Sequence, residues 1–123
     1  MRRPAFLVLG LLVVAGCGAR SNGAQVFRTA PNPNGCYAQV FSGEQFTGTG
    51  DYVNGPWRIP DVLADRRWKG GVRSLRTGPS TTVTLWSDDN YRGSLVRVQS
   101  NQRDSSVSSA LGGVAVSMQI SCN

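Results

Sequence analysis

The chain of 123 residues contains no histidine, and this absence narrows the functional classes. Histidine is the commonest general base of enzymes, the usual activating partner of a nucleophile and a frequent zinc ligand. Paired carboxylates could still catalyse acid–base chemistry, but Asp88-Asp89 stands beside Asn90, and such a trio is typical of solvated turn residues. We therefore predict a binding or structural protein and not an enzyme, with no cofactor.

A hydrophobic run long enough to span a membrane is also missing. The N-terminal apolar stretch, Ala5 to Gly16, covers twelve positions, whereas a transmembrane helix needs about 20. It follows the basic residues Arg2 and Arg3 and ends in small residues before Cys17, which is the layout of a secretory signal. The sequence therefore predicts export from the cytoplasm.

The end of this stretch, Val14-Ala15-Gly16-Cys17, resembles the lipobox of bacterial lipoproteins. The resemblance implies that residues 1–16 are a signal peptide and that Cys17 is acylated and becomes the N-terminus. The protein would then be lipid-anchored on the outward-facing side of the bacterial cell envelope, at the outer membrane if the host has one. The alternative is cleavage by an ordinary signal peptidase, which would give a secreted protein in which Cys17 is incidental.

Cysteine is scarce, with three residues, and three is an odd number for an oxidising compartment. Assigning Cys17 to lipid leaves Cys36 and Cys122 as a candidate disulfide pair. A domain of this size has a small core, so such a covalent link would matter for its stability.

Basic residues outnumber acidic ones without forming a long cationic run. Removal of Arg2 and Arg3 leaves 11 basic and 7 acidic residues, a net charge of +4. This excess favours anionic surfaces at low salt but is too dispersed for a nucleic-acid-binding arm. We expect membrane contact through the lipid, and a protein or polyanionic envelope polymer as a further partner, but no nucleic acid.

One local basic cluster surrounds an aromatic residue, Trp68. As a functional element it would be an anionic docking patch for lipid head groups or envelope polymers. The alternative is that Trp68 is a core residue and the cations merely solvate the surface. The basic cluster consists of Arg66, Arg67, Lys69, Arg73 and Arg76.

The region from residue 17 to residue 35 is rich in Gly, Asn, Pro and Ala, so we predict a flexible tether there. Beyond it, short segments alternate apolar and polar residues and are rich in β-branched or aromatic types, which predicts a mostly β domain over residues 36–123. Only Pro60 to Arg67 has helical character. The predicted strands are Tyr37–Phe41, Asp51–Val53, Val72–Arg76, Thr81–Trp86, Ser94–Gln99 and Val114–Ile120.

The domain repeats itself. Phe41, Phe46 and Gly48 recur 45 positions later as Trp86, Tyr91 and Gly93, and a later strand segment ending in Ser74-Leu75 recurs 43 positions on as Ser117-Met118. The aromatic residues would cover a tight hairpin in which glycine takes a positive φ. The serines would satisfy backbone groups of that hairpin. We place the repeats at about residues 36–77 and 80–122.

These motifs resemble the βγ-crystallin superfamily, whose Greek-key unit carries an aromatic, four residues, Tyr or Phe, one residue and Gly, with a later Ser. Phe41 to Gly48 and Trp86 to Gly93 both fit, and the stretch from Trp68 to Leu75 is similar to the closing segment of the unit. The resemblance covers about residues 36–122. It implies an all-β, two-sheet Greek-key sandwich of about eight strands with one short helical turn.

Many microbial members of that superfamily bind calcium through two Asn/Asp residues, two variable residues and Ser/Thr-Ser. This sequence has Lys69-Gly70 and Gly112-Gly113 at the paired positions, and Arg73 and Val116 at the Ser/Thr positions. Calcium prefers six to eight oxygen ligands that include carboxylates. We therefore predict no metal site, although the resemblance alone would suggest calcium.

Two functional hypotheses follow. The first is a non-enzymatic cell-envelope lipoprotein with a structural or binding domain. The second is a secreted or anchored protease inhibitor, because a small family of bacterial metalloprotease inhibitors shares the crystallin-like fold. An inhibitor would need an exposed, rigid loop that fits a protease cleft, and such a loop is often braced by additional disulfides. We rank the inhibitor second because this chain offers one candidate pair. Trp57 has no role in either motif.

Overall fold

A computed structural model describes residues 27–123. The predicted signal peptide, the predicted lipidation site Cys17 and the first part of the predicted tether lie outside the described residues. Within residues 27–123, no helix is both long enough and apolar enough to span a bilayer.

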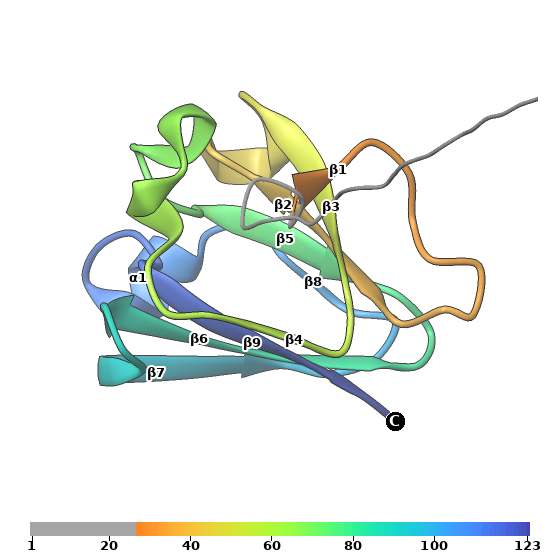
Figure 1. Cartoon of the computed structure of the whole chain (residues 1–123). Coiled ribbons are helices and arrows are strands. Elements are labelled where there is room, and N and C mark those ends of the chain that lie inside the picture. Colours follow the sequence, from red (N-terminus) through yellow and green to blue (C-terminus); the bar gives the residue numbers. More distant parts are fainter. Residues whose placement is uncertain (1–26) are drawn as a thin grey trace, which may run out of the picture.

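Two antiparallel sheets face each other and enclose the core, as Figure 1 shows. The five-stranded sheet has the order β1 (Phe27–Arg28), β3 (Gly50–Asn54), β2 (Tyr37–Phe41), β5 (Ser74–Thr77) and β8 (Arg103–Asp104). The four-stranded sheet has the order β4 (Trp57–Ile59), β9 (Ser117–Cys122), β6 (Thr81–Asp88) and β7 (Arg92–Val98). The predicted all-β two-sheet sandwich is confirmed.

Each half of the chain lends one strand to the other half's sheet. β4, from the first half, pairs with β9 through Trp57↔Ile120, and β8, from the second half, pairs with β5 through Leu75↔Asp104. Both strands are only two or three residues long, and the sequence analysis predicted neither. The exchange makes each sheet depend on both halves.

The core comes from the alternating residues of the central strands, because successive side chains of a strand point to opposite faces. Ala38 and Val40 of β2 face Val83 and Leu85 of β6 across the interior, and all four are fully buried. Trp68 is also fully buried and is the largest side chain that is. Trp68 is thus a core residue, the alternative considered for it above.

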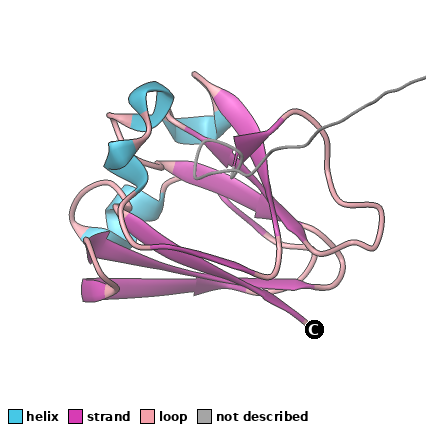
Figure 2. Ribbon diagram, viewed as in Figure 1, coloured by secondary structure: helices cyan, strands magenta, loops and turns pink. Residues whose placement is uncertain are grey.

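The helical turns gather at one end of the sandwich (Figure 2). The single turn predicted over Pro60 to Arg67 is instead two 3-10 turns, η4 (Val62–Ala64) and η5 (Arg66–Trp68). Asp61 caps η4 through the Leu63 N–H, and Asp65 ends η4 and caps η5 through the Arg67 N–H, because Asp side chains bond readily to nearby backbone amides. Two further helical elements were not predicted, η3 (Glu44–Phe46) and α1 (Val107–Leu111).

The predicted tether extends too far toward the domain. Residues from Phe27 onward are part of the fold, because β1 pairs with β3 through Phe27↔Val53 and the Phe27 ring stacks on Trp68. The Asn32 N–H donates to Asn54 Oδ1 at 2.7 Å, and the buried Gly35 carbonyl accepts from the Thr81 hydroxyl at 2.8 Å. The Asn and Pro residues here form ordered turns, whose backbone groups bond to neighbouring side chains.

A disulfide joins Cys36 to Cys122, with 5.3 Å between their Cα atoms and 86 positions between them in sequence. The predicted pairing is confirmed. It links the residue before β2 to the last residue of β9, and therefore closes nearly the whole domain into one covalent loop.

Candidate functional site

The two sequence-matched hairpins have the same geometry. Phe41 and Phe46 meet edge to face with ring centroids 5.7 Å apart, and Trp86 and Tyr91 do so at 5.2 Å. Such edge-to-face pairs are favoured by the ring quadrupoles. The second aromatic residue of each pair has a left-handed φ of 61°, a conformation that costs energy for a bulky side chain.

Glycine is required where each hairpin turns back. Gly48 has φ 81° and Gly93 has φ 87°, and a Cβ at either position would collide with the hydroxyl of Ser42 or Ser87. Those two hydroxyls accept the N–H groups of Thr49 and Ser94 at 2.8 and 2.9 Å. Ser42 and Ser87 were not among the motif residues predicted from the sequence, although they also lie 45 positions apart.

Ser74 and Ser117 hold the hairpins from beneath. The Ser74 hydroxyl donates to the Gly43 carbonyl at 2.6 Å and accepts the Phe46 N–H at 2.9 Å. The Ser117 hydroxyl donates to the Asp88 carbonyl at 2.6 Å and accepts the Tyr91 N–H at 3.0 Å. Both serines are fully buried, and each hydroxyl provides the hydrogen-bond partner of two backbone groups of its hairpin.

The segments compared above with calcium-binding motifs lie at the ends of helical turns. Lys69 and Gly70 are exposed after η5, and Gly112 ends α1 with a left-handed φ of 75°. Gly70, Gly112 and Gly113 have open space where a side chain would begin. Among residues 27–123, no three His, Cys, Asp or Glu side chains gather in a metal-binding arrangement.

Glu44, in η3, bridges the first hairpin to α1. The Ser108 hydroxyl donates to Glu44 Oε2 at 2.5 Å. This hydrogen bond, together with one from Ser106 and the positive charge of Arg73, holds the pKa of the Glu44 carboxyl below its ordinary value. Its carboxylate is therefore engaged within the domain.

The basic cluster, for which docking of anionic ligands was one of the two interpretations, is divided among different partners. Arg67 pairs with Asp51 at 2.9 Å. Arg76 lies over the Phe46 ring, 4.5 Å from its centroid. The positive charge of Arg73 helps to lower the pKa of Glu44. Arg66 and Lys69 are exposed around η5.

Asp51 is a buried carboxylate that the sequence analysis did not identify. Its side chain is 3% exposed. Its carboxylate accepts a hydrogen bond from the Arg67 guanidinium and another from the Trp68 indole N–H, each at 3.0 Å. Phe27 stacks on the same indole with ring centroids 5.0 Å apart. The signal that could have located it is its place in an alternating strand, where Asp51 and Val53 face inward together.

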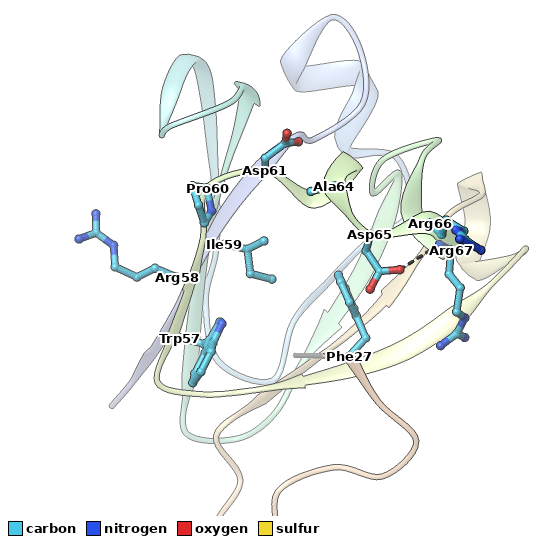
Figure 3. A pocket seen from close by; sticks show the side chains of 10 residues that line it. All are labelled: Phe27, Trp57, Arg58, Ile59, Pro60, Asp61, Ala64, Asp65, Arg66 and Arg67. Carbon is cyan, nitrogen blue, oxygen red and sulfur yellow. Dashed lines mark hydrogen bonds between the residues drawn. The ribbon is translucent and has the colours of Figure 1, made fainter. Parts of the chain in front are cut away.

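A hollow of about 900 Å³ lies beside this network, and Figure 3 shows its lining. β4 and β1, the edge strands of opposite sheets, contribute to it, together with η4 and η5. The hollow is therefore a gap at the open side of the sandwich. Its lining residues are Phe27, Trp57, Arg58, Ile59, Pro60, Asp61, Ala64, Asp65, Arg66 and Arg67.

The domain is similar in structure to known βγ-crystallin domains. One, from work on the evolution of the eye lens βγ-crystallin domain fold, matches with a TM-score of 0.64 at 18% identity, over 79% of this chain and 96% of the other. Spherulin 3a from Physarum polycephalum also gives 0.64 at 18% identity, over 79% and 93%. A βγ-crystallin domain of the abundant perithecial protein from Neurospora crassa, in its Ca²⁺-bound form, gives 0.56 at 20% identity, over 76% and 97%.

Identities at this level show the fold. No protein-family model matches the sequence, and no curated protein does. The domain therefore has the βγ-crystallin fold, as the motif resemblance implied.

Proposed function

We propose that this chain is a non-enzymatic cell-envelope lipoprotein, anchored through Cys17, whose βγ-crystallin-fold domain binds or supports envelope components without calcium. The observation that carries the proposal is the combination of a lipobox with a disulfide-closed domain. Val14-Ala15-Gly16-Cys17 accounts for one cysteine, and the Cys36–Cys122 bond accounts for the other two. Disulfides persist in exported proteins and are rare in the cytosol.

Calcium independence is supported by the chemistry of the paired positions. Lys69-Gly70 and Gly112-Gly113 contribute no side-chain oxygen, and the neighbouring Ser74 and Ser117 hydroxyls already bond to two backbone groups each. Backbone carbonyls alone seldom supply the six to eight oxygens that calcium takes.

Mass spectrometry of the mature protein from a bacterial host tests the anchor. We expect an acylated N-terminal Cys17 and extraction only with detergent, because two or three buried acyl chains give stable anchoring. The Cys17→Ser variant should leave the membrane fraction while keeping its disulfide. An unmodified terminus, or one that begins after Cys17, would exclude the lipoprotein.

Titration calorimetry with calcium tests the second part. We expect no binding heat at millimolar calcium and identical melting curves with calcium and with chelator. A ligand at one hundred times its Kd stabilises a fold by about 2.7 kcal/mol, so a calcium-dependent rise of several degrees in Tm would contradict calcium independence.

A further inference from the structure

Two aromatic rings form one end of the hollow described above. Trp57, on the edge strand β4, is 49% exposed and is not one of the aromatic residues that pair in the two hairpins. Phe27 is held in place because one face of its ring stacks on the buried Trp68. In Figure 3 both rings lie at the same end of the hollow, with Asp61 and Ala64 at the other. A bound molecule would therefore meet exposed ring surface on one side.

Two carboxylates line the hollow, and one oxygen of each is held by a backbone N–H. In Figure 3 the Asp65 carboxylate points into the hollow, whereas the Asp61 carboxylate points away from it. Asp61 Oδ1 accepts the Leu63 N–H at 3.0 Å, and Asp65 Oδ1 accepts the Arg67 N–H at 2.9 Å. The second oxygen of each carboxylate makes no hydrogen bond to another group of residues 27–123. The second Asp65 oxygen is therefore an acceptor that is already positioned before a ligand arrives, which lowers the entropic cost of binding.

The cationic groups of the lining are mostly engaged elsewhere. Arg67 pairs with Asp51, and the Arg58 guanidinium lies over the Tyr91 ring at 4.5 Å. Arg66 is exposed at the rim. Because acidic and basic groups both line the hollow, a strongly charged ligand of either sign would meet like charge there, which is unfavourable.

We propose that the hollow binds an uncharged pyranose oligosaccharide. The C–H faces of sugar rings carry slight positive charge and would pack on the negative faces of Trp57 and Phe27. Sugar hydroxyls would donate to Asp65 and accept from Arg66. The volume of about 900 Å³ lies within the range of about 300 to 1,000 Å³ that is usual for ligand sites, and an apolar wall with a few polar groups is their usual lining.

The proposal goes beyond the envelope function and does not depend on lipidation, because the rings and polar groups that would contact the sugar lie between Phe27 and Arg67. Titration of the detergent-purified full chain with chitotetraose tests it, with fluorescence and calorimetry as readouts. Trp57→Ala should weaken binding by at least about tenfold, equivalent to about 1.4 kcal/mol. Trp57→Phe, which keeps a ring, should retain most of the affinity.

Asp65→Asn tests the hydrogen-bonding half. The Asn oxygen can still accept the Arg67 N–H, so η5 keeps its cap, but the second acceptor becomes a donor. Binding should weaken while Tm stays unchanged. Leu95→Ala is the matched control, because Leu95 is equally 49% exposed but lies on β7, the opposite edge of the four-stranded sheet.

Three results would overturn the proposal. They are an absence of binding at millimolar chitotetraose, binding that Trp57→Ala leaves intact, and tighter binding of a charged probe, dextran sulfate or tetramethylammonium, than of the sugar. Repeating the titration with the Cys17→Ser protein separates the two proposals. Retained membrane anchoring together with retained sugar binding would refute the lipoprotein and leave the hollow as a saccharide site, whereas loss of anchoring with retained sugar binding would support both.

Discussion

Removal of the Ser117 hydroxyl should release the second hairpin. Ser117→Ala leaves the Asp88 carbonyl and the Tyr91 N–H without their partner. A hydrogen bond contributes about 0.5 to 1.5 kcal/mol net, so the loss of two should cost about 1 to 3 kcal/mol. Tyr91 is held in a left-handed conformation, so the loss falls where the backbone is already strained.

Thermal and urea unfolding of the purified protein measure this cost. For a domain of this size, 1 kcal/mol lowers Tm by about 4 to 8 °C. Near-UV circular dichroism adds a local readout, because the Trp86–Tyr91 ring pair sits on the affected hairpin and its signal should weaken in the native state of the variant.

Ser74→Ala is the matched variant, because its two hydrogen bonds have nearly the same lengths. It should lose a similar free energy of unfolding but leave the Trp86–Tyr91 signal intact. Ser105→Ala, at an exposed position, should change stability by no more than about 0.5 kcal/mol. If both buried-serine variants unfold like Ser105→Ala, the hydroxyls do not hold the hairpins and our reasoning is wrong.

Three further predictions concern the disulfide, the acid response and the calcium positions. The free energy of unfolding of the Cys36→Ala/Cys122→Ala double variant should be lower by about 4 to 5 kcal/mol, by the chain-entropy relation for a separation of 86 residues. Urea unfolding measures this difference, and a loss below about 1 kcal/mol would contradict the prediction. Because the pKa of Glu44 is lowered in the fold, its contribution is present above the unfolded pKa and is lost as pH falls through the folded pKa; the Tm of the wild type should therefore fall more than that of Glu44→Gln between about pH 6 and about pH 3, and parallel curves would refute the linkage. The triple variant Lys69→Asn/Gly70→Asp/Arg73→Thr should bind calcium with a Kd of the order of 10⁻⁴ to 10⁻³ M, because it gains side-chain oxygens and Gly70 has room for a side chain. If titration calorimetry detects no heat of calcium binding, the lack of oxygen ligands is not what prevents the wild type from binding calcium.

Local chemistry made the hairpins and the central strands predictable. Phe41, Phe46 and Gly48 sit at fixed spacing because the turn itself demands them, and Ser74 follows because the same turn leaves two backbone groups to satisfy. Such requirements are written into short segments and repeat with them. The alternation in β2 and β6 likewise reflects a face that is buried along its whole length.

The edges of the sheets could not be predicted because tertiary contacts create them. β1 is two residues long and exists because Phe27 packs on Trp68, a residue 41 positions away. β4 and β8 are short for the same reason, since each is defined by pairing with the other half of the chain. The hollow is bounded by two of these edges, so neither Trp57 nor Asp65 stood out in the sequence as a binding residue.

The exchanged strands also decide what a protease could achieve. A cut in the connection between β5 and β6, around Pro79, would divide the backbone into two fragments, yet β4 would stay paired in the sheet of the second fragment and β8 in the sheet of the first. The Cys36–Cys122 bond would still join them covalently. We expect cleavage there to leave an assembled pair of interlocked pieces, because both the exchanged strands and the disulfide hold the halves together without the connecting chain.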